Sequence, residues 1–216
     1  MKKFTIPALA ALFVAAMTAT LFGDTGSFVD SRDGKVYRTV RIGAQTWMAQ
    51  NLNFNASGSA CYDNDESNCQ KYGRLYNWAT VMNGASSSSS SPSGVRGICP
   101  AGWHVPSDAE WTILTNYVSA NGNGTGRVGT KLKSVTGWNT GSGYIAGTDE
   151  FGFTALPGGG GYGGSFSLAG NYGFWWSATE YSATDARYRH MHYTYDDVLE
   201  YWNGKTVQFS LRCLRD

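Results

Sequence analysis

The chain has 216 residues, of which 15% are charged, and its formal net charge is +1. This balance excludes a general electrostatic attraction to nucleic acid or to an anionic membrane surface. The 28 glycines, 13 tyrosines, 10 phenylalanines and 8 tryptophans are typical of a loop-rich globular protein with many aromatic side chains.

The first 23 residues have the pattern of a secretory signal peptide. Lys2 and Lys3 form a short basic region, an apolar run covers residues 4–16, and small residues follow it. We expect cleavage within residues 16–24 and a mature protein that is extracellular or on the cell surface, with a retained N-terminal anchor as the alternative. No later stretch approaches the roughly 20 apolar residues of a membrane span. Residues 24–216 are therefore predicted to form a single domain without a membrane span.

Four cysteines in a chain with a signal peptide predict two disulfides. Three pairings are possible. We favour Cys61 with Cys69 and Cys99 with Cys213, which close one short loop and one very long loop. The loop between Cys61 and Cys69 is rich in Asp, Asn and Ser, and we expect it to be held by Asx turns.

The clearest helix start in the chain is at Ser107. Its side chain can accept the backbone N–H of Glu110, and Glu110 can bond back to the N–H of Ser107, which together form a capping box. Asn121 and Gly122 offer a stop, and the apolar residues between share one helical face: Trp111, Leu114, Tyr117 and Val118. We expect this helix, tied by Cys99 to the last strand, to be the centre of the fold.

Short β-branched and aromatic stretches predict strands on both sides of this helix. Before it, residues 36–42 and 45–50 form a hairpin around Gly43-Ala44, and residues 73–82 are predicted to be a second, short helix. After it, a glycine-rich region over residues 121–173 shows no periodic pattern and is expected to be a long loop, either functional or mobile. Four further strands are expected, at residues 173–180, 187–193, 198–202 and 207–215. Short strands with few helices favour an α+β fold with an antiparallel sheet.

Several blocks of sequence, taken together in this order, resemble the Fibrobacter succinogenes major paralogous domain (FISUMP) family of exported bacterial proteins. The blocks are Asp33–Tyr37, Ile42–Leu52, Cys61–Asp65, Tyr72–Trp78, Cys99–Ser107, Phe174–Glu180 and Ser210–Arg215. They span nearly the whole mature chain. The last block is also similar to the Arg-Cys-Val-Arg ending of formylglycine-generating domains. That likeness implies a C-type-lectin-like fold, with a twisted antiparallel sheet, two helices, a long irregular loop region and a disulfide frame.

The sequence lacks the catalytic residues that an enzyme on this scaffold would need. Formylglycine-generating enzymes use a redox-active cysteine pair near the C-terminus, whereas only Cys213 lies there in this chain. The sequence also contains no nucleophile elbow, no His-Glu-x-x-His motif and no phosphate-binding loop. We therefore expect a non-catalytic protein without a cofactor, and keep an enzyme on this scaffold as an alternative.

Two short motifs could hold a metal ion. His190 and His192 alternate along a predicted strand and would face the same way, but they lack a third ligand, so a polar strand face is the preferred interpretation. Asp63 and Asp65 offer the hard oxygens that suit Ca²⁺, but the loop has neither the glycine nor the distant glutamate of an EF-hand. Calcium at these two residues is kept as a possibility.

The tail of the chain is the best candidate for a binding surface, because aromatic rings there lie among short polar residues. Rings stack on sugar faces or on protein partners, and neighbouring polar groups supply hydrogen bonds. We expect ligand contacts from Tyr188, His190, His192, Tyr195, Tyr201 and Trp202. The predicted function is recognition of a glycan or an extracellular protein through these strands and the glycine-rich loop. A receptor diversified by a retroelement in this C-terminal part is a further alternative.

Overall fold

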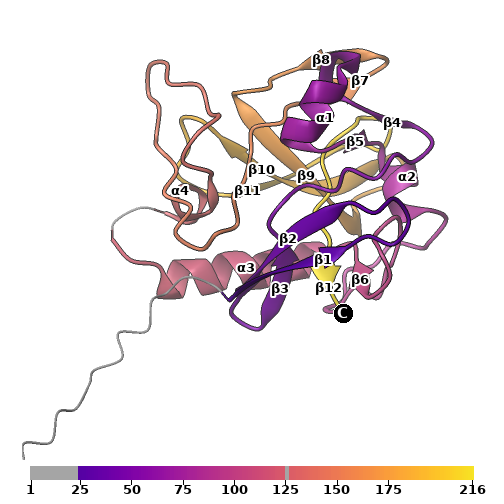
Figure 1. The fold of residues 1–216 in the computed structure, drawn as a ribbon, viewed down its shortest axis with the longest axis horizontal. Coiled ribbons are helices and arrows are strands. Elements are labelled where there is room, and N and C mark those ends of the chain that lie inside the picture. Colours follow the sequence, from indigo (N-terminus) through magenta and orange to yellow (C-terminus); the bar gives the residue numbers. More distant parts are fainter. Residues whose placement is uncertain (1–23, 125–126) are drawn as a thin grey trace, which may run out of the picture.

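The computed structural model describes residues 24–124 and 127–216, so the predicted signal peptide over residues 1–23 lies outside the described residues. The larger of two principal sheets has five strands in the order β1-β2-β3-β12-β6, and its paired strands are antiparallel. The strands are β1 (Thr25–Val29), β2 (Val36–Ile42), β3 (Gln45–Met48), β6 (Trp103–His104) and β12 (Leu214–Arg215). The hairpin expected from residues 36–50 is therefore present as β2 and β3 (Figure 1).

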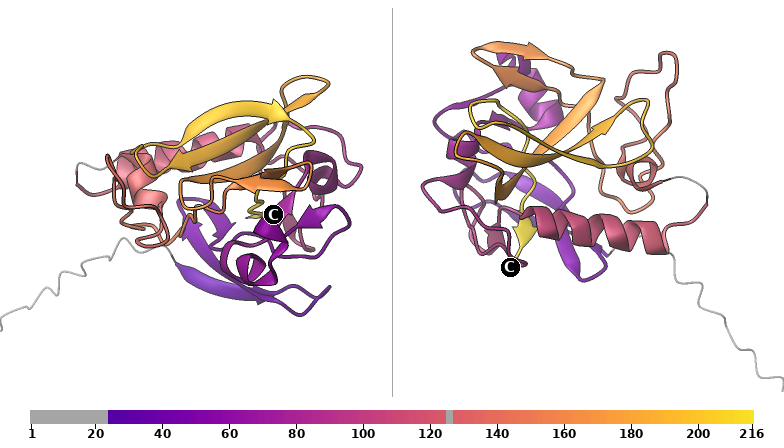
Figure 2. Two further views of the ribbon diagram at one scale, coloured as in Figure 1. Left: turned by 90° about the horizontal axis from the view of Figure 1, so that it is seen from above. Right: turned by 180° about the vertical axis from the view of Figure 1, so that it is seen from behind.

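A second antiparallel sheet is built from the tail of the chain. It contains β9 (Tyr172–Glu180), β10 (Asp185–His192) and β11 (Leu199–Gly204), with β10 in the middle. Two small sheets pair β4 (Ser59–Ala60) with β5 (Leu75–Tyr76) and β7 (Gly160–Tyr162) with β8 (Ser165–Ser167). Seen from above, the three-stranded sheet lies on one side of the molecule and β1 to β3 lie on the other (Figure 2).

Four α-helices occur within residues 24–124 and 127–216, rather than the two expected from the sequence. They are α1 (Glu66–Tyr72), α2 (Trp78–Met82), α3 (Asp108–Asn121) and α4 (Val128–Leu132), and a short 3₁₀ turn, η1 (Tyr62–Asn64), precedes α1. The fold is thus mixed α/β with antiparallel sheets, few helices and two disulfides. The single sheet of the prediction is divided into two principal sheets and two small ones.

Helix α3 begins with the capping box that the sequence predicts. Ser107 Oγ accepts from the N–H of Glu110 at 3.2 Å, and the Glu110 carboxylate accepts from the N–H of Ser107 at 2.9 Å. Trp111 is fully buried on the inner face, where its ring lies 4.8 Å from that of Trp47 in β3 and 6.2 Å from that of Trp175 in β9. The helix therefore connects the two sheets through the core.

The start of α3 is also joined to the tail of the chain through a buried histidine. His104 Nε2 lies 2.8 Å from Glu110 Oε1, and His104 Nδ1 lies 2.7 Å from Asp216 Oδ1. Burial opposes the charged form of this imidazole, but the hydrogen bonds to both carboxylates outweigh it and raise the pKa of His104 above its ordinary value. Glu110 thus caps the helix with one oxygen and holds the histidine with the other.

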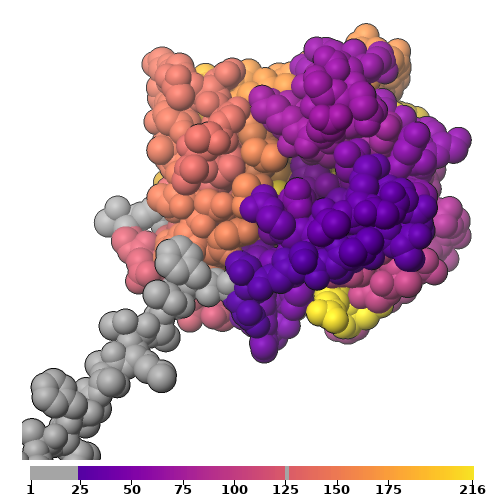
Figure 3. All heavy atoms as spheres, in the orientation of Figure 1, coloured from indigo at the N-terminus to yellow at the C-terminus, as the bar shows by residue number. Residues whose placement is uncertain are grey.

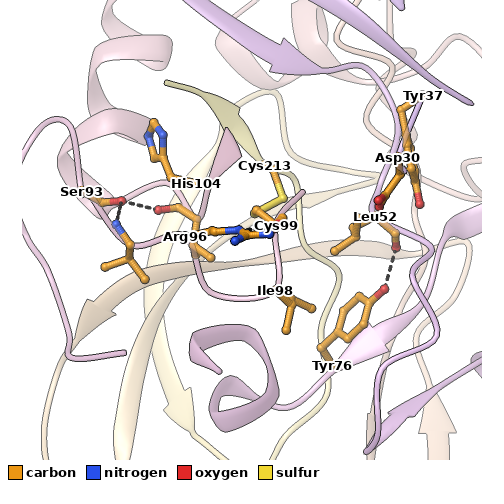
Figure 4. Close-up of a disulfide and its surroundings, with 12 residues drawn as sticks. Asp30, Tyr37, Leu52, Tyr76, Ser93, Arg96, Ile98, Cys99, His104 and Cys213 are labelled. Atoms are coloured by element: carbon orange, nitrogen blue, oxygen red, sulfur yellow. Dashed lines mark hydrogen bonds between the residues drawn. A yellow bond between two sulfur atoms is a disulfide. The ribbon is translucent and has the colours of Figure 1, made fainter. Parts of the chain in front are cut away.

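Both predicted disulfides are present. Cys61 is bonded to Cys69 of α1, and Cys99 is bonded to Cys213 across 114 positions of the chain. Figure 4 shows the long-range bridge in the core, near Tyr76, whose hydroxyl donates to the carbonyl of Leu52 at 3.2 Å. In the chain-entropy model a cross-link across so long a loop stabilises the fold by about 4–5 kcal/mol.

Two buried cations bind loops that have no regular structure. Arg212 is fully buried and donates to Asn51 Oδ1 at 2.9 Å, to the carbonyl of Thr154 at 2.7 Å and to the carbonyl of Phe153. Lys133 donates to three backbone carbonyls at 2.8–3.2 Å, in the loop after α4 and at the end of β10. The glycine-rich region is therefore held to the body by charged groups as well as by its apolar side chains.

Three local predictions were wrong or incomplete. Residues 73–82 form a helix only from Trp78, because Leu75 and Tyr76 pair with β4. The loop between Cys61 and Cys69 has the expected Asx turn, in which the Asp65 side chain accepts from the N–H of Ser67, but this turn is the N-cap of α1, which runs through Cys69 to Tyr72. The strand expected over residues 207–215 is reduced to β12, and the residues before it make isolated bridges to several partners.

Candidate functional site

An open groove of about 650 Å³ lies between the three-stranded sheet and the β7–β8 hairpin. Its walls are mostly aromatic, and no charged side chain of the described residues lines it. The lining residues are Gly160, Gly161, Tyr162, Ser165, Phe166, Ser167, Leu168, Tyr172, Phe174, Tyr188, His190, Tyr201, Asn203, Val207 and Phe209. Three of the predicted contact residues, in β10 and β11, are in this set.

The register of the sheet explains which tail residues face the groove. Tyr188 of β10 is paired with Trp176 of β9 and with Tyr201 of β11, and His190 is paired with Phe174. Paired residues share a face, so the alternate residues of β10 point to the same side, as the sequence predicts. Tyr188, however, is only 7% exposed, because its ring packs against neighbouring aromatic rings of the core. It forms part of the floor of the groove.

Tyr201 is the most exposed of the predicted contact residues, with 52% of its surface accessible. Its ring is stacked on that of Trp202 at 4.5 Å, and Trp202 is stacked in turn on Tyr181 at 4.3 Å. The three rings are nearly parallel, with interplanar angles of 9° and 14°. Trp202 does not line the groove. It therefore supports Tyr201 from behind, while Tyr201 stands at the edge of the groove.

His192, the last residue of β10, and Tyr195, which follows that strand, do not line the groove. Their rings are 4.7 Å apart, and His192 is also 4.1 Å from Tyr172. His192 Nδ1 is 2.7 Å from Thr194 Oγ1, and the carbonyls of His192 and Tyr195 both accept from Lys133. These two predicted residues thus form a separate cluster that adjoins the groove through Tyr172.

The β7–β8 hairpin supplies the wall that the sequence placed in a patternless loop. Gly160 and Gly161 bring its backbone against the body, and a Cβ atom on Gly160 would lie 2.9 Å from the ring of Phe209. Gly161 exchanges two backbone hydrogen bonds with Gln208 at 2.9 and 2.7 Å. The glycine run was visible in the sequence, but the residues it brings to the groove, such as Phe166 and Leu168, were not predicted individually.

The comparison with family models identifies the chain. Residues 40–215 match the model described as the Fibrobacter succinogenes major domain. The chain belongs to this family. No curated protein and no solved structure matches the chain.

One polar group of this Fibrobacter succinogenes major domain stands out at the groove. Burial, and to a smaller extent the neighbouring His192, lower the pKa of His190 to about 4, so its imidazole is neutral at neutral pH. Its Nδ1 atom is buried and has no hydrogen-bond partner among the described residues. A neutral imidazole can offer either a donor or an acceptor to a ligand.

The possible metal sites of this domain have ligand atoms that already serve other roles. Cys61, Glu66 and Cys69 offer ligand atoms within 4.8 Å of one another, but both sulfur atoms are used in the disulfide. Asp65 uses its carboxylate to cap α1, and calcium at Asp63 and Asp65 stays a prediction. No helix of the described residues is long and apolar enough to cross a membrane.

Proposed function

We propose that this domain is an exported, non-catalytic binding module that recognises a neutral glycan in the aromatic groove. The observation that supports this most directly is the groove itself, which is about 650 Å³ in volume and lined by rings and short polar groups. Ligand pockets of this size and composition take molecules of one to a few sugar rings. The lack of charged lining groups among the described residues favours a neutral ligand over an acidic one.

In this proposal Tyr201 provides the stacking surface. Its position at the rim leaves the ring accessible, and the stack with Trp202 and Tyr181 fixes its orientation at little cost in side-chain entropy. The side chains of His190 and Asn203, which both line the groove, supply hydrogen bonds to sugar hydroxyls. Trp202 then acts as a positioning residue rather than a contact residue, which revises the role expected from the sequence.

Export and fold complete the proposal. The two disulfides fit an oxidising compartment outside the cytoplasm. We also propose that the arrangement of sheets, long loops and a disulfide between the segment before β6 and the tail is a C-type-lectin-like fold, as the resemblance of the last sequence block implies.

A glycan array with the purified domain, followed by calorimetric titration of the best neutral glycan, tests this function. Tyr201→Ala should weaken binding about tenfold, since a stacked aromatic ring contributes on the order of 1–2 kcal/mol. Trp202→Ala should weaken it less and leave the same glycan preference. Ile113→Ala, an exposed substitution on α3 that is remote from the groove lining, should bind as the wild type does.

Tyr195→Ala defines the extent of the site. Normal binding by this variant limits the site to the groove, whereas weaker binding extends it to the His192–Tyr195 cluster. Unchanged binding by a correctly folded Tyr201→Ala variant, or no glycan binding at all, would contradict the proposal.

A further inference from the structure

A second pocket, of about 260 Å³, lies between β2, the end of α1 and the loop after β3. It shares no lining residue with the aromatic groove. On the face shown in Figure 3, the indigo segment of β2, the purple segment of α1 and the orange segment of the loop near residue 155 adjoin one another. The pocket is thus built by four segments of the chain, within residues 35–38, 49–53, 69–73 and 154–156.

The charged side chains that line this pocket are all basic. They are Lys35, Arg38 and Lys71, and no acidic residue of the described chain is among the lining groups. Lys35 is partly neutralised, because its ammonium group donates to Asp33 at 3.0 Å and to the carbonyl of Asn53 at 2.6 Å. Arg38 and Lys71 form no ion pair within the residues that the structure describes. Two cations therefore face the pocket without an ion-pair partner among the described residues, although the Asp149 carboxylate is near enough to Arg38 to interact with it electrostatically.

A third, buried cation lies behind the pocket wall. Arg212 bonds to Asn51 Oδ1 at 2.9 Å and to the carbonyl of Thr154 at 2.7 Å, and both of these residues line the pocket. Burial lowers the pKa of Arg212, Asp149 opposes this effect, and the positive charge of Arg38 adds to it. Asp149 offsets part of the positive charge of Arg38 and Arg212, and an anion bound beside Arg38 would offset more of it.

The remaining lining groups suit a small ring. Tyr72 and Leu156 provide apolar surface, and the Lys71 ammonium group lies 4.6 Å from the centre of the Tyr72 ring. An arginine binds a carboxylate through two parallel N–H groups, and a lysine adds a point charge. The volume fits one ring but not an extended chain.

We propose that this pocket binds the carboxylate of a single-ring anion such as a uronic acid, with Arg38 and Lys71 as the contact residues. The same chemistry occurs in a free sugar acid and in an acidic residue of a polysaccharide. The pocket is separate from the aromatic groove, so the proposal does not depend on the function of the groove.

Calorimetric titration of the folded domain with D-glucuronate at low ionic strength tests this site. The wild type should bind glucuronate saturably and show no binding of D-glucose or of the methyl ester of glucuronate, both of which lack the carboxylate charge. Arg38→Gln and Lys71→Gln should each weaken binding about tenfold or more, since each removes a charge-assisted contact. An oligosaccharide with an internal glucuronate residue tells the two sources apart, because it binds only if the pocket accepts a residue within a chain.

Arg41→Gln is the matched control. Arg41 is exposed on the same strand, but it lies on the opposite face from Arg38 and outside the pocket lining. It should bind glucuronate as the wild type does, and so should Tyr201→Ala in the groove. Equal binding of the acid and its methyl ester, equal weakening by Arg41→Gln and Arg38→Gln, or no glucuronate binding would overturn the proposal.

Discussion

Replacement of Arg212 by methionine should cost about 3–5 kcal/mol in the free energy of unfolding. The guanidinium group is fully buried and makes three hydrogen bonds, to Asn51 Oδ1 and to the carbonyls of Phe153 and Thr154. Hydrogen bonds from a charged donor contribute about 1.5–3 kcal/mol each, and their loss leaves the buried carbonyl of Phe153 and the partly buried carbonyl of Thr154 without this partner. Removal of the buried charge recovers part of this cost, so the net effect is smaller than the sum.

Urea unfolding of the oxidised domain, followed by tryptophan fluorescence, measures this change. With a slope of about 2 kcal/mol per molar urea, the midpoint should fall by roughly 1.5–2.5 M. Arg215→Met is the control, because Arg215 is an exposed residue of β12 and its substitution should change stability by no more than about 0.5 kcal/mol. If both variants unfold at the same urea concentration as the wild type, Arg212 does not hold the loop in the way described.

Three further predictions concern the core and its covalent frame. The pKa of His104 in the folded protein lies above its ordinary value of 6.5. The stability that its charged form contributes should therefore be complete below about pH 6.5 and be lost as the pH rises through the folded pKa. Melting temperatures of the wild type and of His104→Asn, measured between pH 5 and 9, should converge at high pH. Trp111→Ala should lower the free energy of unfolding by roughly 3–5 kcal/mol, whereas the exposed Ile113→Ala on the same helix should lower it by less than about 0.5 kcal/mol. Equal melting temperatures of the two variants would exclude a core role for Trp111. Replacement of Cys99 and Cys213 together by serine should lower the free energy of unfolding by about 2–5 kcal/mol, measured by urea unfolding. An unchanged urea midpoint would show that the cross-link does not stabilise the fold.

The elements predicted correctly are those whose signals lie within a few residues of one another. The capping box depends on hydrogen bonds between Ser107 and Glu110, and the β2–β3 hairpin depends on two strand-forming stretches joined by a short turn. Helix α1 was missed because its seven residues, ESNCQKY, have no apolar periodicity, and it is supported by the Cys61–Cys69 bridge and the Asp65 cap. Leu75 and Tyr76 were predicted to lie in a helix because of the apolar pattern around them, but in the structure they pair with β4 and form a strand.

The candidate site was predictable in part for the same reason. Alternation along β10 predicts that Tyr188 and His190 lie on one face of the sheet, and they do so in the structure. The sequence could not show that β10 is the central strand of its sheet, with packing that buries Tyr188. Nor could it show that the β7–β8 hairpin covers this face, because that contact depends on Gly160 approaching the ring of Phe209.

The position of β12 has a consequence for the order in which the fold can be completed. β12 lies between β3 and β6 in the five-stranded sheet, although both neighbours come far earlier in the chain. At translation rates of about 5–20 residues per second, the 114 positions between Cys99 and Cys213 take roughly 6–23 s to synthesise. During that interval β3 and β6 each present an open edge, and the thiol of Cys99 has no native partner, whereas Cys61 and Cys69 can already pair. A nascent chain of this domain is therefore exposed to wrong strand pairing and wrong disulfides until its tail arrives.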